Sequence, residues 1–191
     1  MSVSDAPASA RERLLGAALL RFDREGALGA TLEEIRADAG VSVGALYHHF
    51  ADKRALAGSL YLRTLEGFQE SFRALLDRHP DAEEGVRGAV GYLIDWCTEH
   101  PAEARLLFHG RGAADRARLQ ELNRDFFEHT TRWYSTHVHY GVLRPLPSGL
   151  LAALWLGPAF EYLRQPDQKI DQVTRQELTD AAWRNLAKEP K

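Results

Sequence analysis

The stretch from residue 31 to residue 53 constrains the fold of this chain more than any other, and it reads TLEEIRADAGVSVGALYHHFADK. Thr31 followed three residues later by Glu34 is a capping box, in which each side chain accepts a hydrogen bond from a backbone donor left free where a helix begins. We expect a helix from Thr31, ended by Gly40 in a left-handed conformation. Ser42 offers a second N-cap, and residues 43–50 are enough for about two helical turns.

Two short helices joined by a tight glycine-containing turn form a helix-turn-helix unit. The second helix of such a unit lies in the major groove of DNA. Residues 43–45 are small enough to let the backbone approach a groove, whereas Leu46 and Phe50 can hold the helix to its own core. Residues 47–49 then form an aromatic and imidazole edge, where a plain solvent face would more often carry Lys and Glu. The competing interpretation is an ordinary helical hairpin.

The pattern T-L-E-x-I-x-x-x-A-G-V-S-x-G-x-L-Y-H-H-F-x-D-K over residues 31–53 closely resembles the N-terminal DNA-binding domain of the TetR (tetracycline-repressor) family of bacterial regulators. The rest of the chain resembles that family in length and helical pattern. The resemblance implies an all-helical homodimer that binds double-stranded DNA at a palindromic operator and is released by a small-molecule effector. The implied DNA-binding residues are Thr31, Arg36, Ser42, Val43, Gly44, Ala45, Tyr47, His48, His49 and Lys53.

Arg36 departs from the family pattern, in which a small residue lets the two helices approach. Its stem could instead lie along the helix and present the guanidinium to a phosphate. The charge around the motif is also unusual for a DNA-binding protein, because residues 1–60 carry seven Lys and Arg against eight Asp and Glu. We therefore expect few, well-placed phosphate contacts and weak affinity for nonspecific DNA.

Composition indicates a globular chain. With 191 residues, 45% of them hydrophobic, the chain fits one large domain or two small ones. Its single cysteine, Cys97, cannot form an internal disulfide, which fits a reducing cytoplasm. No apolar run reaches about 18 uncharged residues, and the N-terminus lacks the order of a signal peptide. The expectation is a cytoplasmic protein without a membrane partner.

Periodicity predicts an all-α chain of about nine helices. We expect a helix-turn-helix DNA-binding domain over residues 9–52, a larger ligand-binding and dimerisation domain over residues 53–188, and a disordered tail over residues 1–8. The expected helices cover residues 11–26, 31–39, 43–50, 53–79, 81–99, 102–109, 113–140, 148–164, and a last segment to about residue 188. Pro158 should kink or end the helix over residues 148–164.

Aromatic residues crowd the central helices, and small-ligand pockets are lined mainly by apolar and aromatic groups. Most of these rings could simply fill the core; together they suggest an apolar or aromatic effector. The candidate ligand-binding residues are Phe72, Tyr92, Trp96, Phe108, His109, Phe126, Phe127, Thr130 and Trp133. The resemblance places the dimer interface on the last two long helices, at Leu150, Leu154, Trp155, Phe160, Leu163, Leu178, Ala182 and Trp183. The apolar character of residues 148–164 on every side supports that placement.

No pattern favours an enzyme. A di-iron bundle needs paired Glu-x-x-His steps, and no Glu in the chain has His three residues later. A glycine-rich phosphate loop is also missing. We expect no cofactor and no metal site. The second hypothesis is a helical ligand-binding or protein-interaction module whose helix-turn-helix no longer reads DNA, which the acidic balance and Arg36 favour.

Overall fold

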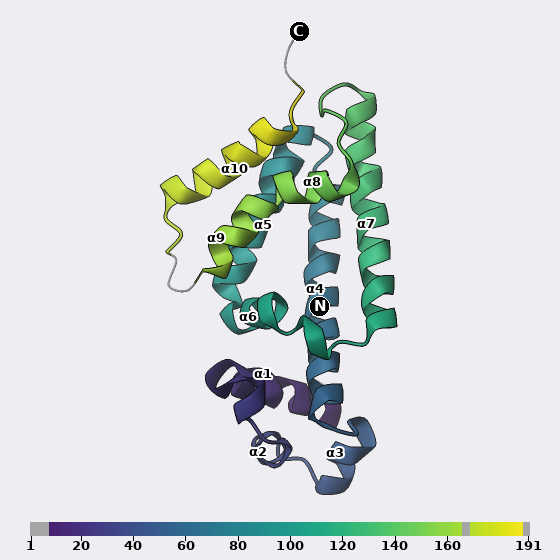
Figure 1. Ribbon diagram of the computed structural model, residues 1–191, viewed down its shortest axis with the longest axis vertical. Helices are drawn as coiled ribbons and strands as arrows, with labels where there is room; N and C mark the ends of the chain where they lie inside the picture. The colour runs from purple at the N-terminus through teal and green to yellow at the C-terminus, as the bar shows by residue number, and fades with distance from the viewer. Residues whose placement is uncertain (1–7, 166–168, 189–191) are drawn as a thin grey trace, which may run out of the picture. The chain divides into compact units, whose positions relative to one another are not determined.

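The computed structural model describes residues 8–165 and 169–188, apart from the side chains of residues 27 and 28. All regular secondary structure in this range is helical (Figure 1), which confirms the predicted fold class. The helices are α1 (Ala10–Gly29), α2 (Leu32–Asp38), α3 (Val43–His49), α4 (Lys53–Arg78), α5 (Ala82–Glu99), α6 (Pro101–His109), the 3-10 turn η1 (Arg111–Ala113), α7 (Arg116–His139), α8 (Ser148–Trp155), α9 (Gly157–Arg164) and α10 (Gln172–Leu186). Of the predicted tail, only Ala8 lies within the described residues.

The chain divides into two compact units. Unit 1 consists of Met1–Leu65 and Ala102–Leu119, and unit 2 consists of Glu66–Pro101 and Gln120–Lys191. Helix α4 contributes its first half to unit 1 and its second half to unit 2. The domains expected over residues 9–52 and 53–188 divide the chain by function, and that division stays a prediction.

Unit 1 is built on α1, against which α2 and α3 pack (Figure 1). Ser9 and Glu12 form a capping box at the start of α1. The helix leaves helical geometry at Gly26, where φ is 72° and ψ is 159°, and resumes as far as Gly29. Gly26 was expected to end this helix. It breaks the helix instead, because a positive φ costs glycine nothing while the following backbone still closes helical hydrogen bonds.

The core of unit 1 brings apolar residues of α1, α2, α3 and α4 together. Its buried members are Leu14, Leu15, Ala18, Ala30, Ile35, Ala39, Val41, Leu46, Phe50, Leu56 and Leu60. Ile35 from α2 and Leu46 from α3 both point into this cluster, so the short helices are held by burial as well as by their caps. Burial of this kind stabilises short helices that would be marginal alone.

In unit 2, α10 packs against α5, and α8 and α9 follow each other beside them (Figure 1). Two tryptophan side chains in unit 2 donate hydrogen bonds from their indole N–H groups to backbone carbonyl oxygens. Trp133 of α7 donates to the His79 carbonyl oxygen at 3.2 Å, and Trp155 of α8 donates to the Val86 carbonyl oxygen at 3.0 Å. Their rings stack with centroids 5.7 Å apart. Gly85 lies beneath Trp133, so the absence of a side chain there makes room for the indole.

Two further expected helices differ from the observed ones. The helix expected from residue 113 begins at Arg116, because Asp115 accepts from the Arg118 backbone N–H at 2.8 Å and caps it there. The helix expected over residues 148–164 is two helices, α8 and α9, with Pro158 in the first turn of the second. Proline is favoured there because its missing N–H would have no helical partner. This break gives ten α-helices in the described part of the chain instead of about nine.

No described helix combines the length and the apolarity needed to cross a membrane.

Candidate functional site

The helix-turn-helix segment of unit 1 has the local geometry that its caps predict. The Thr31 hydroxyl accepts from the Glu34 backbone N–H at 3.2 Å, and the Glu34 carboxylate accepts from the Thr31 N–H at 2.9 Å. The Thr31 hydroxyl also donates to the Glu34 carboxylate at 2.6 Å, and this hydrogen bond, together with that from the Thr31 N–H, lowers the pKa of Glu34. Gly40 has φ 59° and turns the chain after α2. Ser42 then caps α3 by accepting from the Ala45 N–H at 3.2 Å.

Helix α3 has one inward and one outward side. Leu46 and the following Phe50 are buried in the core of unit 1. Val43, Gly44 and Tyr47 are exposed, and the Tyr47 side of the helix continues into the exposed His48 and His49. Tyr47 is 57% exposed, a large fraction for an aromatic side chain. The helix is thereby fixed by Leu46 and Phe50, which leaves its other side open to a partner.

Arg36 is directed at the turn of the motif. Its Nη1 donates to the Val41 carbonyl oxygen at 2.7 Å, its Nε donates to the Glu33 carboxylate at 2.9 Å, and its Nη2 also pairs with Glu33. The pairing raises the pKa of Arg36 and lowers that of Glu33. From the sequence alone, this guanidinium could face a phosphate. The guanidinium, however, holds the turn in the described structure.

Other cations of unit 1 are also tied to its own backbone or acids. Lys53 Nζ donates to the Ala30 carbonyl oxygen at 2.9 Å, which fastens the start of α4 to the segment before α2. Arg13 Nε donates to the Ala39 carbonyl oxygen at 3.1 Å, and Arg21 pairs with Asp38 at 2.6 Å. The Arg11 guanidinium lies 5.7 Å from the centre of the Phe50 ring. These cations position the motif as well as carrying charge.

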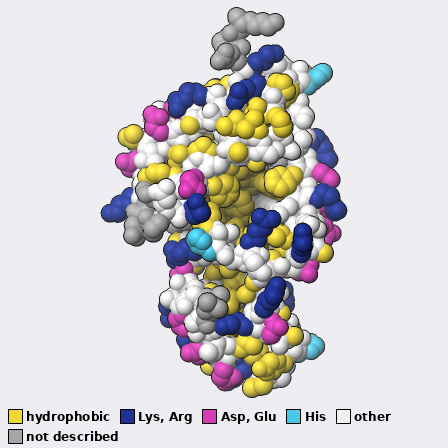
Figure 2. Space-filling model, in the orientation of Figure 1, with side chains coloured by type: hydrophobic (Ala, Val, Ile, Leu, Met, Phe, Trp, Pro, Cys, Tyr) yellow, Lys and Arg dark blue, Asp and Glu magenta, His cyan; other side chains and the backbone are white. Residues whose placement is uncertain are grey.

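Most of the candidate ligand-binding aromatics lie together in unit 2. The Phe72 ring makes edge contacts with Tyr92, at 6.1 Å between centroids, and with Phe126, at 5.3 Å. Phe126 in turn contacts Phe127. Trp96 joins the group through Phe68, which is not among the candidate ligand-binding residues. Figure 2 shows hydrophobic side chains in a hollow of unit 2, beneath α8 and over α5 and the second half of α4.

Two polar residues of α7 are also buried in unit 2. Thr130 is buried, and its hydroxyl has no hydrogen-bond partner among the described residues. A buried unpaired hydroxyl is unusual in a folded protein. His137 is buried against Trp133, with ring centroids 4.4 Å apart, and burial lowers the pKa of its imidazole. Burial also raises the pKa of the Cys97 thiol to about 12.

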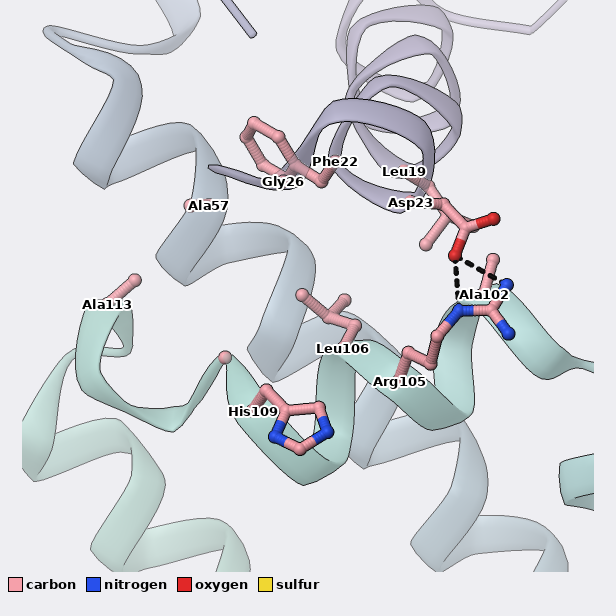
Figure 3. Close-up of a pocket in the computed structure, with 11 residues that line it drawn as sticks. Leu19, Phe22, Asp23, Gly26, Ala57, Ala102, Arg105, Leu106, His109 and Ala113 are labelled. Carbon is pink, nitrogen blue, oxygen red and sulfur yellow. Dashed lines mark hydrogen bonds and ion pairs between the residues drawn. The ribbon is translucent and has the colours of Figure 1, made fainter. Parts of the chain in front are cut away.

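Phe108 and His109 are separated from that group because they belong to unit 1. His109 lines a cavity of about 350 Å³ between α1, α4 and α6 (Figure 3). None of the other candidate ligand-binding residues lines this cavity. Sequence periodicity gave no signal for it, since its walls come from helices far apart in the chain.

The candidate dimer residues differ in their burial. Trp155 and Ala182 are buried within unit 2, so their side chains face its core. Leu150 and Phe160 are exposed, whereas Leu154, Leu163, Leu178 and Trp183 are half-buried. Val173, at the start of α10, is a further exposed apolar residue that the sequence did not single out. The part of the chain that is described contains no cluster of three or more His, Cys, Asp and Glu side chains suited to a metal ion.

Part of this chain matches both a family model and curated relatives. Residues 14–60 match the family model of bacterial regulatory proteins, tetR family. The chain is 29% identical to an HTH-type transcriptional regulator of Staphylococcus aureus over 92 aligned residues. These residues cover 48% of this chain and 50% of that relative. The chain spans about half the length of the curated relatives it matches.

Solved structures extend the likeness over nearly the whole chain. A TetR family transcription regulator from Marinobacter aquaeolei superposes with a TM-score of 0.76 at 18% identity, over 94% of this chain and 96% of that one. The ketosteroid transcriptional regulator KstR2 of Mycobacterium tuberculosis gives a TM-score of 0.71 at 22% identity, over 98% and 100% of the two chains. At such identities the agreement establishes a shared fold.

Proposed function

The chain belongs to the tetR family of bacterial regulatory proteins, and we propose that it is a DNA-binding transcriptional regulator that acts as a repressor. In this proposal a homodimer binds a palindromic operator and a small apolar or aromatic effector releases it. The observation that carries the proposal is the outward side of α3, where Val43, Gly44 and Tyr47 are exposed while Leu46 and Phe50 anchor the helix.

That side of α3 suits insertion into a major groove, which admits an α-helix. A Cβ added at Gly44 would meet no atom within 4 Å, so the position is open and the backbone there can come close to a base edge. Val43 and Ala45 offer methyl groups for contact with thymine, and Tyr47, His48 and His49 offer hydrogen bonds to bases or phosphates. Ser42 and Thr31 support these contacts as caps.

Arg36 and Lys53 are assigned to the same interface with a positioning role. Both already bind carbonyl oxygens of unit 1, and Arg36 also pairs with Glu33. A phosphate approaching Arg36 would compete with the Glu33 carboxylate for the guanidinium. Together with the near balance of charge in residues 1–60, this supports weak nonspecific binding and a shallow dependence of affinity on salt.

The dimer is assigned to the exposed apolar residues of α8, α9 and α10. Leu150 and Phe160 project outward, and the half-buried Leu154, Leu163, Leu178 and Trp183 extend the apolar surface next to them. In this arrangement Trp155 and Ala182 support the surface from inside unit 2. A dimer would present two copies of α3 about 34 Å apart, which matches one helical turn of DNA between half-sites.

The effector site is assigned to the hollow of unit 2 lined by hydrophobic side chains (Figure 2). The partly exposed Tyr92 and Trp96 rings would supply apolar lining. The buried Phe72 ring, which contacts Tyr92 and Phe126, would support it from the core. The unpaired Thr130 hydroxyl is available to orient a polar group of the ligand. If effector and operator favour different conformations, each weakens the binding of the other by the same factor, typically about 1–3 kcal/mol.

The test uses the dimer and DNA selected by it from a random pool. Tyr47→Ala should abolish binding to the selected sequence, whereas Tyr140→Ala, the same change at a residue 75% exposed in unit 2, should leave it unchanged. Both variants should keep the helical ellipticity of the parent protein. Equal operator affinity for Tyr47→Ala and the parent would refute the assigned interface.

The second candidate is a ligand-binding or protein-interaction module that no longer reads DNA. The pairing of Arg36 with Glu33, of Arg21 with Asp38 and of Arg105 with Asp23 favours it, because each pair withdraws a cation from phosphates. A selection that enriches no sequence above the starting pool would support this module. Enrichment of a palindrome would exclude it.

A further inference from the structure

A cavity of about 350 Å³ lies inside unit 1, between α1, the first half of α4 and α6 (Figure 3). Its volume falls within the range of about 300–1,000 Å³ that small-molecule sites occupy. Every residue that lines it belongs to unit 1, which separates it from the hollow of unit 2. Its lining includes the exposed residues Asp23, Arg105 and His109, so the cavity is accessible from solvent.

The lining is predominantly apolar. Leu19 and Phe22 of α1 face Leu106 of α6 across the space (Figure 3). Ala57 of α4 and Ala113 lie on the side of the cavity opposite Asp23 and Arg105, and their small side chains leave room for a ligand. Gly26, where α1 breaks, also lines the cavity, so the positive φ there shapes one wall.

The polar lining residues restrict the ligand. The Asp23 carboxylate and the Arg105 guanidinium bind each other at 2.6 Å, so the charge of each is compensated. A charged ligand would have to displace one member of this pair, whereas a neutral ligand leaves the pair intact. His109 can donate or accept one hydrogen bond at the cavity. The chemistry therefore suits a neutral, mainly apolar molecule that carries one hydrogen-bonding group.

We propose that this cavity is a second small-molecule site, within the unit that holds the helix-turn-helix, and that it takes a neutral apolar ligand with one hydrogen-bonding group. The proposal stands on the cavity alone and does not depend on DNA binding. The ligand would contact α1 through Leu19 and Phe22. A ligand bound in this cavity would thus contact the helix against which α2 and α3 pack.

The test measures binding of prodan, a neutral naphthalene ketone whose emission shifts to the blue in apolar surroundings, to the full chain without DNA. The parent protein should bind prodan saturably. Leu106→Trp fills the cavity and Ala102→Leu reduces it, so each should weaken binding at least about tenfold. His109→Leu should weaken it less, because only the hydrogen bond is lost.

Leu20→Trp is the matched control, since Leu20 neighbours Leu19 on α1 but is exposed and does not line the cavity. It should bind prodan like the parent. An anilinonaphthalene sulfonate, which adds a negative charge to a similar ring system, should not displace prodan.

Far-UV ellipticity is measured first for every variant. If Leu106→Trp does not fold, the smaller change Ala102→Leu decides the matter. Two results would overturn the proposal: no saturable prodan binding by the parent protein, or undiminished binding by a folded Ala102→Leu variant. The latter would place any prodan site outside this cavity, and it would leave the proposed DNA and effector sites untouched.

Discussion

Gly85→Ala tests the packing of α5 against α7 in unit 2. A Cβ at this position would lie 2.7 Å from Cη2 of Trp133 and closer still to its Cζ2. Carbon atoms do not approach this closely, so the indole must move. Its Nε1 donates to the His79 carbonyl oxygen, and its ring stacks on Trp155, so movement disturbs both contacts.

The expected cost follows from three contributions. Overpacking of a buried site costs about 1–3 kcal/mol. Weakening the indole hydrogen bond costs about 1 kcal/mol more. Alanine is favoured over glycine inside a helix by about 1 kcal/mol, which offsets part of the loss. We therefore expect Gly85→Ala to lower the free energy of unfolding of unit 2 by about 1–3 kcal/mol.

Gly88→Ala provides the matched control in the same helix. A Cβ there would meet Leu75 and His79 at 3.6 and 3.7 Å, which is ordinary van der Waals contact. This variant should gain up to about 1 kcal/mol from helix propensity. Urea unfolding followed by tryptophan emission, which arises from unit 2 alone, gives both values. Gly85→Ala should therefore lower the free energy of unfolding of unit 2, whereas Gly88→Ala should raise it.

A Gly85→Ala variant as stable as Gly88→Ala would refute the described contact. A double-mutant cycle with Trp133→Phe sharpens the test, because a smaller ring makes room for the methyl group. The cost of Gly85→Ala should then shrink in the Trp133→Phe background, with a coupling energy above about 0.5 kcal/mol. Additive effects would mean that Gly85 and Trp133 do not touch.

Two further predictions concern a cap and a buried imidazole. Thr31→Ala should destabilise unit 1 by about 0.5–2 kcal/mol while Thr31→Ser should not, as measured by urea unfolding, because only the hydroxyl caps α2. Burial lowers the pKa of the His137 imidazole in the folded protein, so as the pH falls the unfolded chain binds a proton at this residue before the folded protein does. The contribution of the neutral imidazole to stability is therefore lost as the pH falls below about 6.5. His137→Gln should therefore lose less stability than the parent between about pH 7.5 and 5.5, and an equal loss in both proteins would contradict this assignment.

Local signals made the helix-turn-helix predictable. The caps at Thr31 and Ser42 act over three residues, and Gly40 is needed where φ is positive, so the sequence itself carries this information. The all-helical fold followed from periodicity in the same way. The split into α8 and α9 lay within reach, because Pro158 was expected to kink or end the longer helix.

Contacts between distant residues were not predictable. Asp23 and Arg105 lie 82 residues apart, and nothing near either residue indicates the other. The cavity beside them depends on how α1 and α6 pack, which periodicity does not specify. Arg36 shows a similar limit at short range, since its carbonyl partner Val41 is chosen by the geometry of the turn and the rotamer of a long side chain.

The stacked indoles of Trp133 and Trp155 also have a spectroscopic consequence. All four tryptophans of the chain, which include Trp96 and Trp183, belong to unit 2, and unit 1 contains none. Indole emission therefore reports on unit 2 alone, whereas far-UV ellipticity reports on the helices of both units. If the two signals yield different denaturation midpoints, the units unfold separately, and the native chain supplies its own optical label for telling them apart.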